Sequence, residues 1–446
     1  MRGFDVAEER RDEARDRRAG GLRREPLPGD EFPGDAQAPK FAHDARPGFI
    51  DGWVRGRVLN VLRGLVGGEI LLTEGADRER LGCPAEDGLQ ARVAVRDPAL
   101  YRELLFGGSL GAAEAYLQGS WDCDDLVAFL RIACRNYDSL MRLDRGPAAP
   151  LMAALRLRHR LSRNTQRGSR RNIAAHYDLG NEFFSLFLDR DLMYSSGLFA
   201  EPGMSLDEAS QRKLDAVCRR LRLQPGQHLV EIGTGWGGLA AFAARECGCR
   251  VTTTTVSRQQ YEFATQRIEA QGLSDRVTVL LEDYRDLRGT YDALVSIEMV
   301  EAVGREFLPR YFAKCASLLK PEGRMLIQAI TMPEQRYEAY SRSVDFIQRY
   351  IFPGGHLPSV REMLNAVAAA PGLRFLFAEQ FPDSYALTLR EWRRRFETRR
   401  KDVRELGFDE RFLRMWEYYF CYCEAAFLER AVSVGHFLWE KNHWSA

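Results

Sequence analysis

The stretch HLVEIGTGWGGLAAF, residues 228–242, decides the predicted fold. It begins with an apolar segment at 229–232, continues through a turn with four glycines, and enters a run of small and apolar residues at Leu239. Glycine has no Cβ, so the backbone can turn sharply and approach a ligand, and the N–H groups that open the next helix are free to bind it. We therefore predict a strand, a turn and a helix that bind a polar ligand in an open α/β sheet.

Two classes of ligand fit this turn. Gly233, Gly235 and Gly238 satisfy the G-x-G-x-x-G pattern of dinucleotide-binding proteins. That pattern needs an acidic residue about 20 residues further on, after the second strand, to bind the ribose. The second strand is expected at 250–256 and is followed by SRQQ, which contains no acid. Instead Glu231 precedes the first glycine, where it can orient the turn or bind the ammonium of an amino-acid group. This arrangement is similar to the first motif of S-adenosylmethionine-dependent methyltransferases.

Length, charge and cysteine content narrow the class of protein. A chain of 446 residues with 45% apolar residues predicts two or three domains. A formal charge of +1 argues against a nucleic-acid binder. No apolar run approaches the roughly 18 residues of a membrane span, and the first residues lack the apolar core of a secretory signal. The nine cysteines show no paired C-x-x-C spacing, so we expect a cytoplasmic protein with reduced thiols and no metal site.

Composition also predicts the boundaries of the N-terminal parts. Residues 1–48 form a disordered charged arm, because they contain too few large apolar residues to build a core. Residues 49–150 form a small α/β domain. Residues 151–171, with seven arginines and no acid, form a basic linker that can also contact an anionic membrane surface. A second basic cluster, WRRRFETRRK at 392–401, is suited to the same contact, and the tail at 408–444 is expected to pack as a pair of helices.

Seven motifs in one order give the chain a resemblance to a known family. They are HYDLGNEFF, MYSSGLF, VEIGTGWGGLA, EDYRDL, SIEMVEAVG, LKPEGRMLIQAI and RYIFPGGHLPS. From about residue 90 onward the sequence resembles the cyclopropane-fatty-acyl-phospholipid synthases and the mycolic acid cyclopropane synthases. The resemblance implies a Rossmann-like class I methyltransferase domain at 172–446, with lipid-binding insertions and C-terminal helices. It also implies S-adenosylmethionine as the cofactor and an unsaturated acyl chain of a membrane phospholipid as the acceptor.

The resemblance assigns the cofactor pocket residue by residue. The acidic tip of the strand at 277–281 is expected to meet the adenine, because ligands of open α/β sheets bind beyond the carboxyl ends of strands. The assigned residues are Tyr177, Tyr194 and Ser195 near the methionine part, Glu231, Gly233, Gly235 and Gly237 at the turn, Thr255, Ser257 and Gln260 near the ribose, and Asp283 at the adenine.

The chemistry requires a base. An alkene is a weak nucleophile, so the site must hold it against the sulfonium methyl group and exclude water, and a proton must leave the resulting cation. In the resembled synthases bicarbonate is the base, held by a Cys, a Glu, a His, a Tyr and a backbone group of an Ile. The motifs map these ligands to Ser196, Glu301, Gln328, Tyr385 and Ile330. Two side chains are changed, which leaves open whether bicarbonate binds or Glu301 or Tyr385 acts directly.

Three functions follow. The first is a cyclopropane fatty acid synthase, which would lie at the inner face of the membrane as a peripheral enzyme and, by resemblance, as a homodimer. The second is a related lipid C-methyltransferase that makes methylene- or methyl-branched chains, because a different proton loss from the same cation gives that product. The third is a catalytically silent protein that binds lipid or cofactor. The presence of Glu301, Tyr385 and the whole glycine turn argues against the third.

Overall fold

The computed structural model of the protein describes residues 49–140, 154, 179–370 and 372–442. The predictions for the charged arm, for all but one residue of the basic linker, and for Tyr177 lie outside the described residues. All of the described residues belong to one compact unit. The boundaries predicted between the small α/β domain, the linker and the methyltransferase domain stay predictions.

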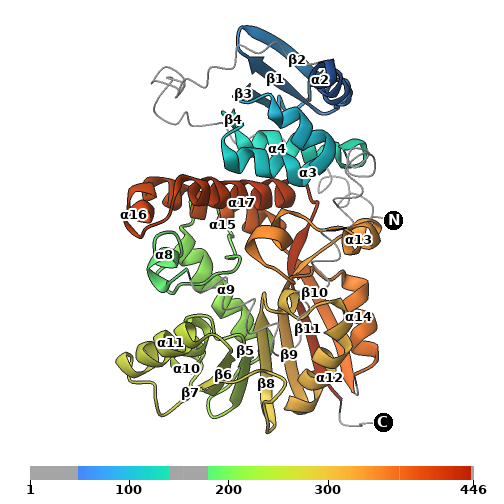
Figure 1. The fold of residues 1–446 in the computed structure, drawn as a ribbon. Coiled ribbons are helices and arrows are strands. Elements are labelled where there is room, and N and C mark those ends of the chain that lie inside the picture. Colours follow the sequence, from blue (N-terminus) through green and yellow to red (C-terminus); the bar gives the residue numbers. More distant parts are fainter. Residues whose placement is uncertain (1–48, 141–153, 155–178, 371, 443–446) are drawn as a thin grey trace, which may run out of the picture. The chain divides into compact units, whose positions relative to one another are not determined.

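A seven-stranded sheet forms the centre of the C-terminal part (Figure 1). Its order is β10-β11-β9-β8-β5-β6-β7; β7, β6, β5, β8 and β9 run parallel, and β11 is antiparallel to both β9 and β10. The chain leaves β5 toward β6 on one side and later enters β8 on the other, so the strand order reverses beside β5, where open α/β sheets bind their ligands. The strands are β5 (His228–Ile232), β6 (Arg250–Thr255), β7 (Val277–Leu281), β8 (Tyr291–Ile297), β9 (Leu319–Thr331), β10 (Leu373–Gln380) and β11 (Ser433–Lys441).

Helices cover both faces of this sheet. Alternate residues of β5 point to opposite faces, so Leu229 packs with α9, α10 and α11, whereas Val230 and Ile232 pack with α12 and α14. This doubly wound arrangement confirms the predicted α/β fold. The helices are α9 (Leu206–Leu221), α10 (Gly238–Glu246), α11 (Arg258–Ala270), α12 (Leu308–Leu318) and α14 (Val360–Ala368). Shorter helices in the connections are α8 (Asn181–Ser185), η1 (Val300–Ala302), η2 (Arg305–Phe307), α13 (Glu334–Ser341) and the π-helix η3 (Ile347–Ile351).

The N-terminal part contains a four-stranded sheet of order β2-β1-β3-β4. Its elements are α2 (Phe49–Arg63), β1 (Gly68–Glu74), β2 (Asp77–Cys83), β3 (Gln90–Val95), α3 (Ala99–Gln118), β4 (Trp121–Cys123) and α4 (Leu126–Arg135). The sequence at 109–135 has the pattern of a single helical stretch, and that interpretation is wrong because β4 interrupts it. Gly119 ends α3 in a left-handed conformation, and the Asp125 side chain caps α4 by accepting a hydrogen bond from the Ala128 N–H.

The C-terminal tail differs from the prediction. It contains one helix, α17 (Glu410–Leu428), followed by the strand β11, so the expected pair of helices is wrong. Both faces of β11 are buried, and this hides the alternation that identifies a strand. Phe437 and Trp439 face the α12 side of the sheet, and Leu438 faces the α9 side. A Cβ at Gly435 would lie 2.6 Å from the carbonyl oxygen of Glu379. This position of β11, between β10 and β9, therefore accepts only glycine.

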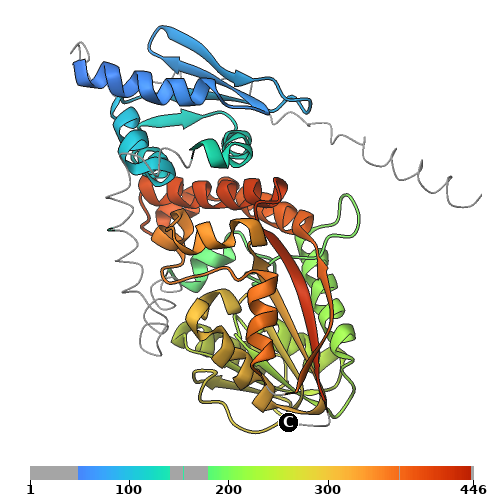
Figure 2. The same cartoon turned by 90° about the vertical axis from the view of Figure 1, so that its right-hand side faces the viewer.

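Helix α17 joins the two parts of the compact unit (Figure 2). The Arg414 guanidinium donates to the carbonyl oxygens of Tyr116 and Trp121 and pairs with Asp122. At the other end of α17, Glu429 pairs with Arg131 and Arg135 of α4. The N-terminal sheet and the C-terminal helices therefore share buried contacts.

The basic cluster at 392–401 lies on α15 (Pro382–Thr398) and α16 (Arg400–Glu405). Each of its basic side chains has an acidic partner within the described residues, so the cluster is largely neutralised within the fold. The pairs are Arg393–Glu424, Arg394–Glu391, Arg395–Asp207, Arg399–Asp402, Arg400–Glu417 and Lys401–Glu405.

Candidate active site

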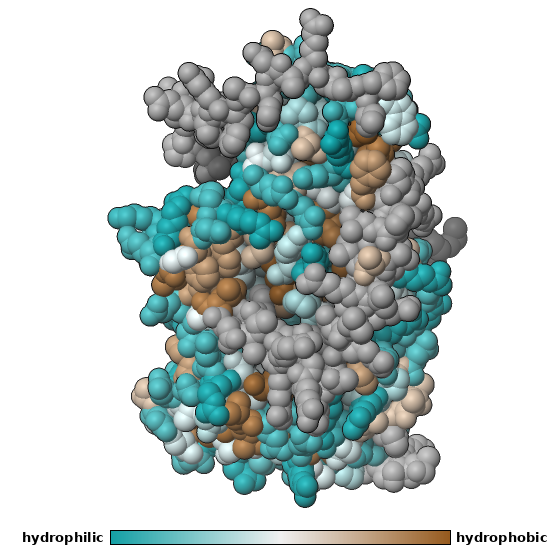
Figure 3. Space-filling model, in the orientation of Figure 1, coloured by the Kyte–Doolittle hydropathy of each residue, from teal (hydrophilic) through white to brown (hydrophobic). Residues whose placement is uncertain are grey.

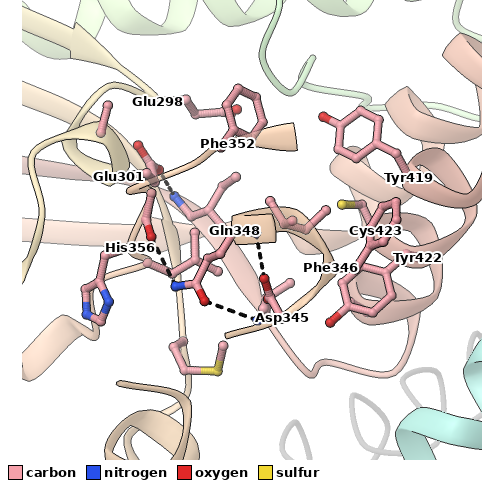
Figure 4. A pocket seen from close by; sticks show the side chains of 18 of the residues that line it. Glu298, Glu301, Asp345, Phe346, Gln348, Phe352, His356, Tyr419, Tyr422 and Cys423 are labelled. Carbon is pink, nitrogen blue, oxygen red and sulfur yellow. Dashed lines mark hydrogen bonds between the residues drawn. The ribbon is translucent and has the colours of Figure 1, made fainter. Parts of the chain in front are cut away.

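A cavity of about 520 Å³ begins at the carboxyl ends of the parallel strands and continues to the helices of the N-terminal part. Its first part contains polar side chains of the β5, β6 and β7 loops. Its middle contains two carboxylates, Glu298 and Glu301, opposite aromatic residues of α17 (Figure 4). Its far part is lined by apolar residues of α2, α3 and α4, among them Leu62, Leu104 and Phe129.

The glycine turn lies at the polar end of this cavity. Gly233 and Gly235 have φ angles of +101° and +52°, a region that strains other residues. A Cβ at Gly233 would lie 3.4 Å from the Cγ of Met299, so the turn after β5 touches the loop after β8. The predicted cofactor residues that border the cavity are Tyr194, Ser195, Glu231, Gly233, Gly235, Thr255, Gln260 and Asp283.

Two other predicted cofactor residues lie beside the cavity without bordering it. Gly237 precedes α10 in a left-handed conformation, and a Cβ there would lie 3.2 Å from the Cβ of Ala264. Ser257 is buried and caps α11 by accepting a hydrogen bond from the Gln260 N–H at 3.3 Å. Asp283 borders the cavity, but its carboxylate is held in an ion pair with Arg285 at 2.7 Å.

A buried lysine that no sequence pattern indicates supports the cofactor end. Lys213 of α9 donates a hydrogen bond from Nζ to Ser195 Oγ at 2.7 Å, and its side chain is fully buried. Burial lowers the pKa of Lys213 to about 8, while the nearby carboxylates of Glu298, Asp189 and Glu231 oppose this shift. Its sequence neighbours KLDAVCRR resemble an ordinary amphipathic surface helix, so nothing in the pattern marks this lysine as internal.

Glu231, the acid before the turn, is buried as well. It accepts a hydrogen bond from Thr253 Oγ1 at 2.6 Å, and burial raises the pKa of its carboxyl group to about 8. This hydrogen bond connects β5 and β6. The two roles predicted for Glu231, to orient the turn or to bind an ammonium group, stay predictions.

Glu298 is a site residue that the prediction missed, although it lies within the motif SIEMVEAVG. Its carboxylate receives three hydrogen bonds. Ser196 N donates to Oε1 at 2.9 Å, Gln328 Nε2 donates to Oε1 at 2.7 Å, and the Tyr385 hydroxyl donates to Oε2 at 2.6 Å. An acid at the carboxyl end of β8, beside the reversal of the strand order, was the signal that could have identified it.

These three donors belong to residues that the resemblance assigned to bicarbonate. Ser196 and Gln328 are fully buried behind Glu298 and do not border the cavity, whereas Glu298 does. Bicarbonate therefore does not fit, because the carboxylate of Glu298 already holds the hydrogen-bond donors that a bound anion would need.

Glu301 lies three residues further along the chain and borders the same cavity. Its Oε1 accepts a hydrogen bond from the Ile330 N–H at 2.6 Å, and its Oε2 has no hydrogen-bond partner among the described residues. Burial, and then the charge of Glu298, raise the pKa of Glu301 to about 8. The two carboxyl groups lie on the same side of the pocket (Figure 4).

A chain of buried polar groups supports Glu298 from behind. The Arg220 guanidinium contacts Nδ1 of His436, and Nε2 of His436 contacts Oε1 of Gln328 at 2.8 Å. Burial and the charge of Arg220 lower the pKa of His436 well below its ordinary value, so the ring is neutral. On the other side of Arg220, Glu379 completes an ion pair.

Aromatic side chains form the wall opposite the carboxylates. Tyr194 donates its hydroxyl to that of Tyr419 at 3.1 Å, and Tyr385 stacks on Phe427 with ring centroids 4.5 Å apart. Among the aromatic and apolar residues at 337–358, whose pattern is suited either to an acyl tunnel or to ordinary core packing, Tyr340, Phe346, Ile347 and Phe352 border the cavity. The lining does not include Tyr350 and Ile351.

Membrane-spanning helices and metal sites are both absent from the described ranges. No helix in 49–140, 179–370 or 372–442 is long and apolar enough to cross a bilayer. No group of His, Cys, Asp and Glu side chains in these ranges has the arrangement of a metal site.

Comparison with known proteins agrees with this geometry. The family described as mycolic acid cyclopropane synthetase matches residues 164–437. Tuberculostearic acid methyltransferase UfaA1 of Mycobacterium tuberculosis is 41% identical over 339 residues, which cover 74% of this chain and 79% of that protein. Cyclopropane-fatty-acyl-phospholipid synthase of Escherichia coli K12 is 35% identical over 360 residues, which cover 80% and 89%.

A solved structure shows the same fold with a cofactor product bound. It is mycolic acid cyclopropane synthase CmaA1 complexed with SAH and CTAB, with a TM-score of 0.58 and 29% identity, covering 61% of this chain and 98% of that one. SAH is what S-adenosylmethionine becomes after it gives up its methyl group. Together the fold, the cavity and these matches confirm the predicted class I methyltransferase domain and its cofactor. The chain belongs to the mycolic acid cyclopropane synthase family and is an S-adenosylmethionine-dependent methyltransferase.

Proposed function

We propose that the enzyme transfers a methyl group to a double-bond carbon of an unsaturated fatty acyl chain of a membrane lipid. One observation carries this proposal: a single cavity joins the glycine turn, the carboxylates of Glu298 and Glu301, and an apolar channel that ends among α2, α3 and α4. A polar cofactor suits the first region and an acyl chain suits the last. The reacting carbons then lie between them, beside groups that can accept a proton.

The residues at the polar end hold the cofactor. Tyr194 and Ser195 approach its methionine part, Thr255 and Gln260 its ribose, and the backbone of Gly233 and Gly235 lies against it, as the resemblance implies. Asp283 and its loop border the adenine. When bound, S-adenosylmethionine supplies an electrophilic methyl group. The chain's own contribution is to hold the alkene against that group and to exclude water.

The aromatic side chains that face the carboxylates stabilise the cationic intermediate. Attack by the alkene leaves a cation on the acyl chain, and ring faces such as those of Tyr194, Phe352 and Tyr419 stabilise positive charge. The cation is then neutralised by loss of a proton to a group in the middle of the cavity. The cavity therefore has a suitable environment for each stage of the reaction.

Two products are chemically reachable. Removal of a proton from the new methyl group closes a cyclopropane ring, whereas a hydride shift before the same proton loss gives a methylene-branched chain. We favour the branched product for two reasons. Ser196 and Gln328 stand where the resembled ring-forming synthases have a Cys and a His, and a relative with 41% identity is named as a methyltransferase for tuberculostearic acid. The cyclopropane ring is the other candidate.

The lipid and the membrane contact belong to this proposal as well. We propose phospholipid acyl chains with a cis double bond as substrate and a peripheral position on the inner face of the membrane. The paired cluster at 392–401 does not support that contact. On the face shown in Figure 3, most of the coloured residues are hydrophilic, and the apolar ones form separate small patches. The homodimer stays a prediction.

Lipid analysis tests the function. We would express the enzyme in a bacterial host and analyse total fatty acids by gas chromatography with mass spectrometry. A species one CH₂ heavier than the mono-unsaturated acid supports the proposal. Uptake of hydrogen on mild hydrogenation identifies the branched alkene, and resistance identifies the ring. Gly233→Val blocks the cofactor turn and should abolish the species, whereas Gly203→Val, at a positive φ with open space around it, should not. If the host that expresses the wild-type enzyme contains no new fatty acid species, the proposal is contradicted.

A further inference from the structure

The most unusual group in the cavity is the carboxylate of Glu298. It has no cation within ion-pair distance among the described residues and is instead held by a backbone N–H, an amide and a phenol. Oε1 accepts two hydrogen bonds and Oε2 accepts one, so Oε2 keeps a lone pair free. Because Glu298 borders the cavity, that oxygen can accept a proton from a molecule bound there.

The backbone at this position is strained in order to hold the carboxylate. Glu298 has a φ of +47°, in the left-handed region that residues other than glycine rarely adopt. Its N–H donates to the carbonyl oxygen of Gln328 at 2.8 Å, so the backbone and side chain of one residue fix those of the other. Strained residues of this kind cluster at functional sites, where the surrounding structure holds them in place.

The position of Glu298 relative to the cofactor is also defined. Its neighbour Met299 lies against Gly233 of the glycine turn, and Ser196, which donates to Glu298, follows Ser195 at the methionine end. The carboxylate therefore lies between the methyl donor and the aromatic wall. A base for the methylated chain is needed in that position.

Glu301 is the alternative base, and its environment argues against it. The charge of Glu298 and burial raise the pKa of Glu301 to about 8, so Glu301 mostly keeps its proton at neutral pH. Burial raises the pKa of Glu298 too, but its three hydrogen bonds and the buried Lys213 oppose that rise. Two neighbouring carboxyl groups in unequal environments divide into a neutral acid and a charged base.

We propose that Glu298 is the general base of this enzyme and that its carboxylate takes the place of a bound bicarbonate, so that catalysis needs no added anion. The proposal rests on the methyl transfer proposed above. The alkene attacks the sulfonium methyl carbon; a carbon–carbon bond forms, and the carbon–sulfur bond breaks with its electron pair staying on sulfur. The resulting cation loses a proton to Oε2 of Glu298. The electrons of that C–H bond form the new carbon–carbon bond of a ring or the π bond of a methylene group.

The experiment removes the carboxylate and offers the anion back. Glu298→Gly suits the positive φ and leaves Ser196 N, Gln328 and Tyr385 free to bind a small anion. We would assay wild type and variant in buffer free of carbon dioxide, on dioleoyl phosphatidylglycerol vesicles with S-adenosylmethionine. Wild type should keep its rate to within about twofold whether or not bicarbonate is added. Glu298→Gly should lose roughly 100-fold or more, the range of general-base catalysis, and regain activity with formate or bicarbonate.

A binding measurement supplies a readout that does not depend on turnover. Line broadening of ¹³C-labelled bicarbonate or formate in NMR should show saturable binding to Glu298→Gly and none to wild type. Calorimetry with S-adenosylhomocysteine shows whether the cofactor end is intact in the variant. Glu322→Gly makes the same change at another positive φ, 64°, on an exposed residue, and should behave as wild type in every assay.

Two results would overturn the proposal. One is a wild-type rate that depends on bicarbonate, together with saturable bicarbonate binding to wild type. The other is full activity of Glu298→Gly without any added anion. If wild type methylates no lipid, the function proposed above fails, and the NMR comparison then decides alone whether Glu298 occupies the anion position.

Discussion

The Nε2 atom of His436 lies 2.8 Å from Oε1 of Gln328, and this contact decides which way a buried amide points. Arginine can only donate, so Nδ1 of His436 accepts from Arg220 and its Nε2 must carry the proton. That proton goes to the amide oxygen of Gln328, which turns the amide nitrogen toward Glu298. The neutral ring of His436 does not touch Glu298, but through Gln328 it keeps an amide N–H donor directed at the Glu298 carboxylate.

This network predicts the cost of replacing Gln328. Gln328→Met has a similar volume but leaves His436 without an acceptor and Glu298 without one donor. Hydrogen bonds to charged groups contribute roughly 1.5–3 kcal/mol, and the buried partners stay unsatisfied. We expect the free energy of unfolding, measured with urea, to fall by about 2 kcal/mol or more. Gln118→Met on the exposed end of α3 should change it by less than about 0.5 kcal/mol. Equal effects of both variants would contradict the network.

The hydroxyl of Tyr385 predicts a pH effect. It donates to Oε2 of Glu298 at 2.6 Å, which favours the charged form of that carboxyl group. Tyr385→Phe removes this hydrogen bond, so the pKa of Glu298 rises and activity is lost at a higher pH as the solution is acidified. The acidic limb of the kcat profile should move upward by roughly one pH unit. Tyr291→Phe, at the opposite end of β8, should leave the limb in place. A downward shift in Tyr385→Phe would contradict the assignment.

The raised pKa of Glu301 predicts how stability depends on pH. Its carboxyl group has a pKa of about 8 in the folded protein against an ordinary 4.5. Between these values the folded state binds a proton that the unfolded state has released, so stability is greatest below pH 4.5 for this group and falls as pH rises toward 8. Glu301→Gln removes this contribution.

Urea unfolding of the ligand-free protein measures the contribution of Glu301 to the pH dependence of stability. Each pH unit across the window changes the free energy of unfolding by at most about 1.4 kcal/mol per group. Between pH of roughly 5.5 and 7.5, wild type should therefore lose about 2 kcal/mol more than Glu301→Gln does. Glu231 titrates in the same direction and is unchanged in both proteins, so it serves as an internal reference. Identical pH dependence of the two proteins would show that Glu301 ionises normally.

The sequence predicted the sheet and the cofactor end of the site because both depend on local patterns. The glycine turn, the apolar strands and their polar tips are each visible within a few residues, and eight assigned cofactor residues border the cavity. The strand β11 was mistaken for a helix because it is buried on both faces, where the alternation of a strand disappears. Its partners β9 and β10 are more than 50 residues away along the chain, so no local signal shows the pairing.

The interior charges could not be predicted for a different reason. Lys213 and His436 belong to no motif, and they are internal only because α9 packs against the sheet, where Lys213 meets Ser195 and Arg220 meets His436. Glu298 lies in the motif SIEMVEAVG, but the resemblance assigns the role of bicarbonate ligand to Glu301 and none to Glu298. Which of two acids faces a set of donors depends on three segments, around Ser196, Gln328 and Tyr385, that meet only in the folded protein.

The apolar channel gives the last prediction. Cys423 of α17 borders the cavity beside Tyr419 and Tyr422, across the pocket from Glu301 (Figure 4). Cys423→Phe adds a ring to this space, so we expect turnover of long-chain phospholipids to fall at least roughly tenfold, the size of a misplaced substrate effect. Binding of S-adenosylhomocysteine, measured by calorimetry, should stay unchanged because the cofactor end lies at β5 and β6. Cys83→Phe makes the same change on the exposed strand β2 and should affect neither measurement. If Cys423→Phe instead weakened cofactor binding and spared lipid turnover, the acyl chain would have to enter by another route.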